Sequence, residues 1–177
     1  TGVQTCALPI YNPTQSHSIE GESVSTEDPA QSAAHAGGTT SDIPVEPQSL
    51  EWMRRLVAIP SISGTSNLGV IELIEAEFAR YGYTGQRTYN ADQTRANLWV
   101  TVPAADGSTE GGIVISGHTD VVPVEGQTWD SDPFTLRVEG SRAYGRGVCD
   151  MKGFLGVALW LLPQVARAQL RVPLHFA

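Results

Sequence analysis

The sequence predicts an α/β domain with a largely parallel sheet, preceded by a segment that does not fold. Helix-type and strand-type runs alternate from residue 48 onward, an order that is typical of α/β domains. The short apolar run Ile113–Ile115 is of the kind found in buried strands. Residues 11–47, in contrast, contain almost no large apolar side chains, so they cannot bury enough surface to offset the loss of chain entropy.

Charge is distributed unevenly along the 177 residues. The net charge is −8, and residues 11–47 contain acidic residues but no Lys or Arg, which leaves the remainder close to neutral. A nucleic-acid-binding surface needs a basic patch, and this balance argues against one. The two cysteines, Cys6 and Cys149, form no disulfide framework and fit a cytoplasmic protein. No apolar run reaches the ~18 residues that a membrane helix needs.

The first ten residues, TGVQTCALPI, resemble the translation of a sequencing-library adapter. All ten match one reading frame of that adapter, so we expect residues 1–10 to be foreign and exclude them from fold prediction. Residues 11–47 are expected to form a disordered acidic tail in which His17 and His35 have no function. Residues 48–177 remain as the folded part.

The folded part begins with two predicted helices, each with apolar residues at helical spacing. Pro60 ends the first helix. Ser66 or Asn67 caps the second helix, and Gly82 ends it. The apolar residues are Leu50, Met53, Leu56 and Val57 in the first helix, and Ile71, Ile74, Phe78 and Tyr81 in the second.

Strand-like runs and one further helix follow. The runs are Gln86–Tyr89, Asn97–Val102, Ile113–Ile115, Thr135–Val138, Arg142–Tyr144 and Val172–Phe176. The turn residues at 139–141 predict a hairpin between the fourth and fifth runs. The apolar segment Met151–Leu162 predicts a helix that Pro163 kinks or ends. His175, in the last strand, is expected to be structural.

A candidate metal ligand lies directly after the strand-like run that ends at Ile115. The sequence there is Gly117-His118-Thr119-Asp120. Open α/β sheets place their ligand sites beyond the carboxyl ends of strands, and residues two apart in extended backbone face the same side. His118 and Asp120 are therefore expected to point into one cavity, where the carboxylate can hold the imidazole in one tautomer. A surface turn is the alternative at this point.

The second candidate site is GRGVCDMKG, residues 145–153. Glycines on both sides of Asp150 indicate tight backbone geometry around this acid, which is either a helix N-cap or a metal-binding carboxylate. Arg146 and Lys152 are candidates for contact with an acidic substrate, although a solvated or ion-paired charge is the expected role of both. Cys149 is expected to be a small buried hydrophobe.

The two sites together resemble the signature of a known family. The stretch ISGHTDVVPVEGQTWDSDPFTL, followed by YGRGVCDMKGF, is similar to the motifs of the zinc aminoacylase, carboxypeptidase and desuccinylase family of metallopeptidases. The resemblance extends from about Leu50 to the end of the chain. It implies that residues 48–177 are the truncated amino-terminal part of a three-layer α/β/α zinc-hydrolase domain, with the insert domain and the remaining catalytic half absent.

The resemblance also implies roles for three residues. His118 would bind one metal ion, Asp150 would bridge two, and Asp120 would be the catalytic carboxylate that orients His118. The expected cofactors are two divalent metal ions, zinc or alternatively cobalt, which activate water and polarise the amide carbonyl. The family typically has a cis peptide after its bridging acid, which corresponds to the Asp150–Met151 bond. Its general base and other ligands, an adjacent Glu pair among them, are expected outside this sequence.

The resemblance implies that the parent protein hydrolyses an N-acyl amino acid. Within the family, YNADQTRANL and GHTDVVPVEGQTW are most similar to the acetylornithine deacetylase group, which acts in arginine biosynthesis. The alternatives are a succinyl-diaminopimelate desuccinylase, a related carboxypeptidase or aminoacylase, and a non-catalytic metal-binding module. We expect a small-molecule substrate, a cytoplasmic homodimer, no nucleic-acid or membrane partner, and no activity of the 177-residue fragment alone.

Overall fold

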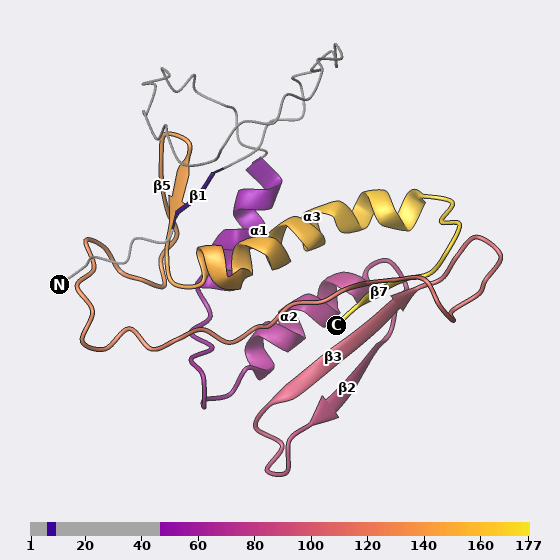
Figure 1. Cartoon of the computed structure of the whole chain (residues 1–177), viewed down its shortest axis with the longest axis horizontal. Helices are drawn as coiled ribbons and strands as arrows, with labels where there is room; N and C mark the ends of the chain where they lie inside the picture. The colour runs from indigo at the N-terminus through magenta and orange to yellow at the C-terminus, as the bar shows by residue number, and fades with distance from the viewer. Residues whose placement is uncertain (1–6, 10–46) are drawn as a thin grey trace, which may run out of the picture.

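The computed structural model describes residues 7–9 and 47–177 of the chain (Figure 1). The expectations for residues 1–6 and 10–46, which include most of the adapter-like leader and the acidic tail, lie outside the described residues. The elements are β1 (Ala7–Pro9), α1 (Pro47–Val57), α2 (Leu68–Ala79), β2 (Gly85–Tyr89), β3 (Ala96–Val102), β4 (Ile113–Ile115), β5 (Arg137–Glu139), β6 (Arg142–Tyr144), η1 (Val148–Lys152), α3 (Gly153–Arg167) and β7 (Leu174–Phe176).

Helices α1 and α2 confirm the first two predicted helices. Gly82 follows the end of α2 at φ +82°, a left-handed conformation that glycine adopts at little cost. Asn67 precedes α2, but its side chain does not cap the helix. The Leu68 amide donates to the Ser66 hydroxyl instead, which leaves the Asn67 side chain for contacts elsewhere in the fold.

Four strands form a mixed sheet in the order β2-β3-β7-β4. The β2–β3 and β3–β7 pairs are antiparallel, and the β7–β4 pair is parallel. The mixed α/β architecture is confirmed. The alternation of elements predicted a largely parallel sheet, and this is wrong for the described strands, because two of their three pairs are antiparallel. The reason lies in the connections, because residues 90–95 between β2 and β3 are too few for the crossover that a parallel pair needs.

Helices α1, α2 and α3 lie on one side of this sheet (Figure 1). Burial alternates along β3, so that one face of the strand enters the core while Trp99, on the other face, is 40% exposed. The described residues therefore contain two of the three predicted layers. The main core consists of Leu56, Val70, Ile71, Phe78, Leu98, Val100, Val102, Leu159 and Leu162.

Strand β4 is less buried than its sequence predicts. Ile113 and Val114 are 58% and 50% exposed, so the expectation of a buried strand is wrong for the described residues. The cause is position, because β4 pairs only with β7 and forms the edge of the described sheet. The apolar run identified the strand without indicating how far other segments cover it.

A second sheet has the order β1-β6-β5. Strands β5 and β6 form the predicted hairpin, with Glu139 paired to Arg142 and Gly140 at φ +54° in the turn. Residues Ala7–Pro9 of the adapter-like leader pair antiparallel with β6. An edge strand offers its unpaired N–H and C=O groups to any neighbouring segment, so this pairing is compatible with a foreign leader.

Helix α3 continues through Pro163 to Arg167, so the helix does not end at the proline. Pro163 removes only one N–H donor from the helix, and the residues after it complete another turn. The 20-residue segment Val148–Arg167 is long and apolar enough to cross a membrane by length and composition, a length that the sequence analysis did not find. Here α3 contacts α1 and contributes Leu159 and Leu162 to the core, as a core helix does.

Candidate metal centre

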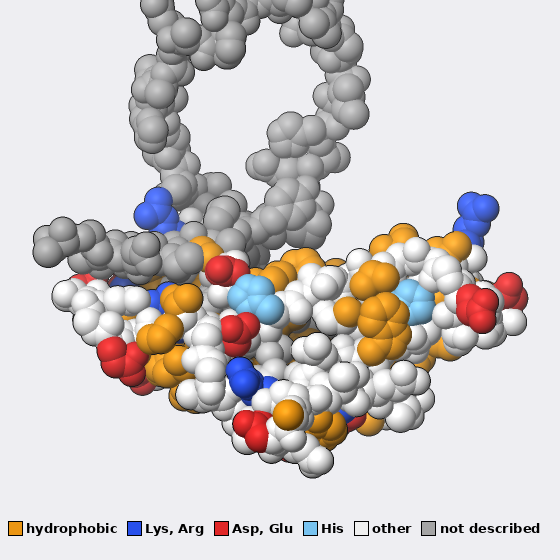
Figure 2. Space-filling view, turned by 60° about the horizontal axis from the view of Figure 1, so that its bottom comes forward, with side chains coloured by type: hydrophobic (Ala, Val, Ile, Leu, Met, Phe, Trp, Pro, Cys, Tyr) orange, Lys and Arg blue, Asp and Glu red, His pale blue; other side chains and the backbone are white. Residues whose placement is uncertain are grey.

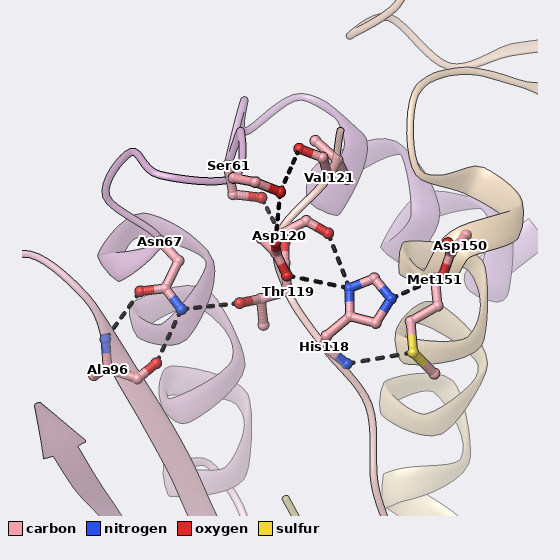
Figure 3. A network of polar contacts seen from close by, with 10 residues as sticks. Ser61, Asn67, Ala96, His118, Thr119, Asp120, Val121, Asp150 and Met151 are labelled. Atoms are coloured by element: carbon pink, nitrogen blue, oxygen red, sulfur yellow. Dashed lines mark hydrogen bonds and ion pairs between the residues drawn. The ribbon is translucent and has the colours of Figure 1, made fainter. Parts of the chain in front are cut away.

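The loop after β4 and the turn η1 bring the two predicted metal ligands together (Figure 3). Nε2 of His118 lies 2.7 Å from Oδ1 of Asp150, although the two residues are 32 positions apart in the sequence. Asp150 lies inside η1 but has a non-helical backbone (φ −131°, ψ 91°). The Asp150–Met151 peptide bond is cis, as the family resemblance implied.

Asp120 holds the imidazole of His118 from the other side. Nδ1 of His118 lies 3.0 Å from the main-chain oxygen of Asp120 and 3.3 Å from its Oδ1. Both oxygens are acceptors, so Nδ1 carries a proton and donates it. This arrangement directs Nε2 toward Asp150, which is the orientation that a metal-binding histidine needs.

The charges of the site shift two pKa values. Burial lowers the pKa of His118, but its hydrogen bonds to Asp150 and to the Asp120 main chain, together with the charge of both carboxylates, outweigh burial and raise it above its ordinary value. The pKa of Asp120 is lowered, first by the hydrogen bond from the Ser63 hydroxyl and also by the charge of His118, against the opposing effect of burial. Both shifts favour the charged forms, so the pair is electrostatically complementary.

The donor set fits a divalent metal ion. Nε2 of His118 and Oδ1 of Asp150 lie within hydrogen-bond distance of each other, and imidazole nitrogen and carboxylate oxygen are both ligands that zinc takes in proteins. Their side chains are 46% and 82% exposed, and Figure 2 shows histidine and acidic side chains exposed together on one face. Within the described ranges, however, no group of three or more His, Cys, Asp or Glu could hold an ion, whereas catalytic zinc usually keeps three protein ligands. These two residues would thus be part of a ligand set.

A pocket opens beside this pair. It includes His118 and Asp120 and is bordered by α2, β2, β3 and α3. Its apolar side chains include Phe78 from α2 and Phe154 from α3. The candidate ligand His118 therefore lines a space that a small molecule can enter. Asp150 does not line the pocket but contacts His118, which does.

The other histidine in the described part of the chain is structural, as predicted. Nε2 of His175 lies 2.7 Å from the Gly111 carbonyl oxygen, and Nδ1 lies 2.9 Å from the Thr101 hydroxyl. The residue is 6% exposed. Because both ring nitrogens are engaged within the sheet, His175 has no nitrogen left for a metal ion.

Arg146 is neither solvated nor ion-paired, which corrects the sequence prediction. It is 7% exposed, its guanidinium donates to the side-chain oxygen of Gln127, and it lies 5.0 Å from the centre of the Trp129 ring. Its main-chain amide donates to the Pro133 carbonyl. Arg146 therefore holds the loop of residues 122–134 against the segment between β6 and η1.

Lys152 is also buried, contrary to the prediction. The side chain has no exposed surface, and Nζ donates to the carbonyl of Ile59 at 2.6 Å. Burial lowers the pKa of Lys152 to about 8. Lys152 thus links η1, which contains Asp150, to the segment that follows α1, and it does not reach the pocket surface.

Several contacts at the site involve residues for which the sequence analysis predicted no functional role. The His118 amide donates to Sδ of Met151 at 3.3 Å, and the Asn67 side chain donates to the Thr119 hydroxyl at 2.9 Å. The Ser61 hydroxyl donates to the Thr119 carbonyl at 2.6 Å. The sequence gives no signal for these contacts, because each joins segments that are distant in the chain.

Gly147 allows η1 to approach the histidine loop closely. Its φ is +81°, and a Cβ atom there would lie 2.5 Å from Cγ1 of Val121, the residue after Asp120. We expect Gly147→Ala to destabilise the chain by more than the ~1–2 kcal/mol of a left-handed alanine alone. Urea unfolding measures the loss. Gly126→Ala is the matched control, because Gly126 has φ +73° and no atom within 4 Å of its Cβ position; equal losses would contradict the collision.

The sequence of this chain is similar to those of known proteins. Residues 114–177 match the family described as Peptidase family M20/M25/M40. The acetylornithine deacetylase of Erwinia tasmaniensis is 36% identical over 136 residues, which cover 73% of this chain and 34% of that protein. The acetylornithine deacetylase of Salmonella arizonae is 36% identical over 138 residues, or 74% and 35% of the two proteins. The chain therefore spans about a third of the length of the curated relatives that it matches.

Two solved structures share the fold. Human carnosine dipeptidase 1 superposes with a TM-score of 0.61 at 21% sequence identity, over 73% of this chain and 31% of that one. An M20-family metallo-carboxypeptidase from Sulfolobus solfataricus superposes with a TM-score of 0.56 at 24% identity, over 73% and 30%. These likenesses support the partial α/β domain described above.

Proposed function

We propose that residues 48–177 of this chain, which matches peptidase family M20/M25/M40, are part of the catalytic domain of a metal-dependent hydrolase of linear amides. The observation that carries the proposal is the contact of 2.7 Å between His118 and Asp150. The two residues come from separate motifs of the sequence, and both side chains are open to solvent.

Each candidate residue has a distinct role in the proposed site. His118 would bind an ion through Nε2, and Asp120 would keep Nδ1 protonated and the ring oriented. Asp150 directs Oδ1 toward His118, so that its other oxygen is available to a second ion. A bound zinc or cobalt ion supplies Lewis acidity toward water and the amide carbonyl.

We propose N-acetylornithine as the substrate, with ornithine and acetate as products, in arginine biosynthesis. The support is the similarity to acetylornithine deacetylases over nearly three quarters of this chain. We further propose a cytoplasmic homodimer. Light scattering of the full-length protein checks the oligomeric state, and a monomeric mass would contradict it.

The 177-residue chain is proposed to be inactive by itself. The candidate ligands His118 and Asp150 are fewer than the three that catalytic zinc usually keeps. The sequence also contains no adjacent Glu pair, which the family resemblance makes the source of the general base. General acid–base catalysis contributes ~10²–10⁴-fold, so its loss alone would lower the rate of hydrolysis by about that factor.

The test compares the full-length gene product with the 177-residue chain, each supplied with zinc or cobalt. The full-length product is expected to release acetate from N-acetylornithine in preference to succinate from N-succinyl-diaminopimelate, and a chelator is expected to stop both reactions. The 177-residue chain is expected to release neither acid.

Three outcomes would change the assignment. A preference for the succinyl substrate would identify a desuccinylase. A full-length product that binds metal but hydrolyses no N-acyl amino acid would leave only a metal-binding module. Activity of the 177-residue chain alone would show that the general base lies within it.

A further inference from the structure

The segment that joins α1 to α2 lies against the loop that carries His118 and Asp120 (Figure 3). We infer that Ser63, in this segment, is a positioning residue that fixes the Asp120 carboxylate and, through it, the metal-binding orientation of His118. The inference rests on the proposed metal site, but it concerns residues of the segment 61–67 that neither motif contains.

The backbones of the two segments are joined next to Asp120. The Ser63 amide donates to the Val121 carbonyl at 2.8 Å, and the Val121 amide donates to the Ser61 carbonyl at 2.9 Å. Ile62 and Val121 thereby form an isolated parallel bridge. This pairing places the Ser63 side chain beside the side chain of Asp120.

Side chains fasten the same segment on both flanks. Ser61, at 1% exposure, donates its hydroxyl proton to the Thr119 carbonyl at 2.6 Å. The Asn67 amide group donates to the Thr119 hydroxyl and to the Ala96 carbonyl, each at 2.9 Å, and accepts from the Ala96 amide at 3.0 Å. The segment is therefore tied to β3 as well as to the histidine loop, which gives Ser63 a fixed base.

The two carboxylate oxygens of Asp120 have different partners, because Oδ2 accepts from the Ser63 hydroxyl and Oδ1 lies near His118. Oγ of Ser63 lies 2.6 Å from Oδ2 of Asp120 and 3.2 Å from the Val121 carbonyl. A hydroxyl has one proton to donate, and the shorter contact with a charged acceptor is the stronger. Oδ2 is thereby held, and Oδ1 stays 3.3 Å from Nδ1 of His118.

Removal of the Ser63 hydroxyl frees the Asp120 carboxylate to rotate. The His118 ring would then lose the contact of Nδ1 with Oδ1 of Asp120 and keep the one with the Asp120 main-chain oxygen, so that Nε2 would be held less firmly toward Asp150. Outer partners of metal ligands typically change metal affinity by 10–100-fold. Ser63 acts through Asp120 and is exposed, so that water can partly replace it, and we expect an effect near the lower end, about 10-fold.

The experiment uses the full-length protein with three variants. Ser63→Ala removes the hydroxyl, and Ser63→Thr retains it. Thr65→Val is the matched control, because the Thr65 hydroxyl donates to the Ile62 carbonyl at 2.7 Å within the same segment and does not contact Asp120. The Kd for zinc is expected to rise about 10-fold in Ser63→Ala, to recover in Ser63→Thr and to stay unchanged in Thr65→Val.

A second measurement needs no metal. In the metal-free protein, ¹H–¹⁵N NMR correlations of the His118 ring are expected to show one ordered form with a protonated Nδ1. Ser63→Ala is expected to broaden these signals or split them into two forms, while Ser63→Thr and Thr65→Val keep the single form. This measurement reports ring orientation, which a general loss of stability would not alter selectively.

The outcomes separate this inference from the proposed function. A wild-type protein that binds zinc but hydrolyses no N-acyl amino acid would overturn the enzyme assignment, while affinity and NMR still decide on Ser63. If the protein binds no zinc, the NMR comparison decides alone. An unchanged His118 ring in Ser63→Ala, or an equal effect in Thr65→Val, would overturn the positioning role.

Discussion

Replacement of Asp150 by alanine is expected to lower kcat/KM of the full-length protein by more than about 10²-fold, because even outer partners of metal ligands change activity by 10–100-fold. Asp150 would itself be a ligand, and its Oδ1 lies 2.7 Å from Nε2 of His118. Without the Asp150 side chain, the imidazole of His118 keeps its orientation from Asp120, but a cation bound by His118 would have no carboxylate ligand beside it. Zinc titration and acetate release measure the two losses separately.

Controls distinguish a ligand from a helix cap at this position. Asp150→Asn keeps the shape and one side-chain oxygen but removes the charge, so it is expected to lose metal affinity while it retains stability. Asp106→Asn is the matched control, since Asp106 is an exposed acid that accepts the Ser108 amide at 2.9 Å and lies outside the site. Full activity of Asp150→Ala would show that Asp150 only shapes the start of α3.

Replacement of Phe78 by alanine is expected to lower the free energy of unfolding by about 3–5 kcal/mol, the usual cost of removing a buried aromatic ring. Phe78 is 1% exposed in the main core. Its ring packs edge-on against Phe176 of β7 with the ring centres 4.9 Å apart. The substitution would therefore weaken the contact between α2 and the sheet. Urea unfolding of the 177-residue chain measures the change.

Two further variants test the explanation by burial. Phe78→Leu keeps most of the apolar volume and is expected to lose less stability than Phe78→Ala. Phe154→Ala removes the same ring from α3, where it is 41% exposed, and is expected to cost less than about 1 kcal/mol. A loss in Phe154→Ala as large as that in Phe78→Ala would contradict the core that the structure describes.

Helices and turns that depend on residues close together in the sequence could be predicted from it. The stripe that contains Ile71 and Phe78 predicted α2, because apolar side chains three and four positions apart lie on one helix face. The turn around Gly140 predicted the β5–β6 hairpin. Of the two effects predicted for Pro163, the end of the helix is wrong, because the cost of a missing donor depends on how well the rest of the helix packs.

Only part of the candidate site could be predicted from the sequence. His118 and Asp150 could be singled out from their motifs, but each also had a local explanation, a surface turn or a helix cap. The contact of 2.7 Å between them depends on the meeting of two segments that are distant in the chain. The support from Ser63 could not be predicted either, since nothing in the segment 61–67 indicates which loop it faces.

The sequence by itself determined the helices α1, α2 and α3, the strands β2 to β7, and the two motifs that hold the candidate ligands. Only the tertiary structure decided that Lys152 and Arg146 are buried, that β4 is an exposed edge and that β7 inserts between β3 and β4. The physical reason is that the spacing of apolar side chains, which predicts a helix or a strand, is a property of one segment. Burial and strand pairing depend instead on which distant segments meet, and that choice is made by the packing of the whole chain.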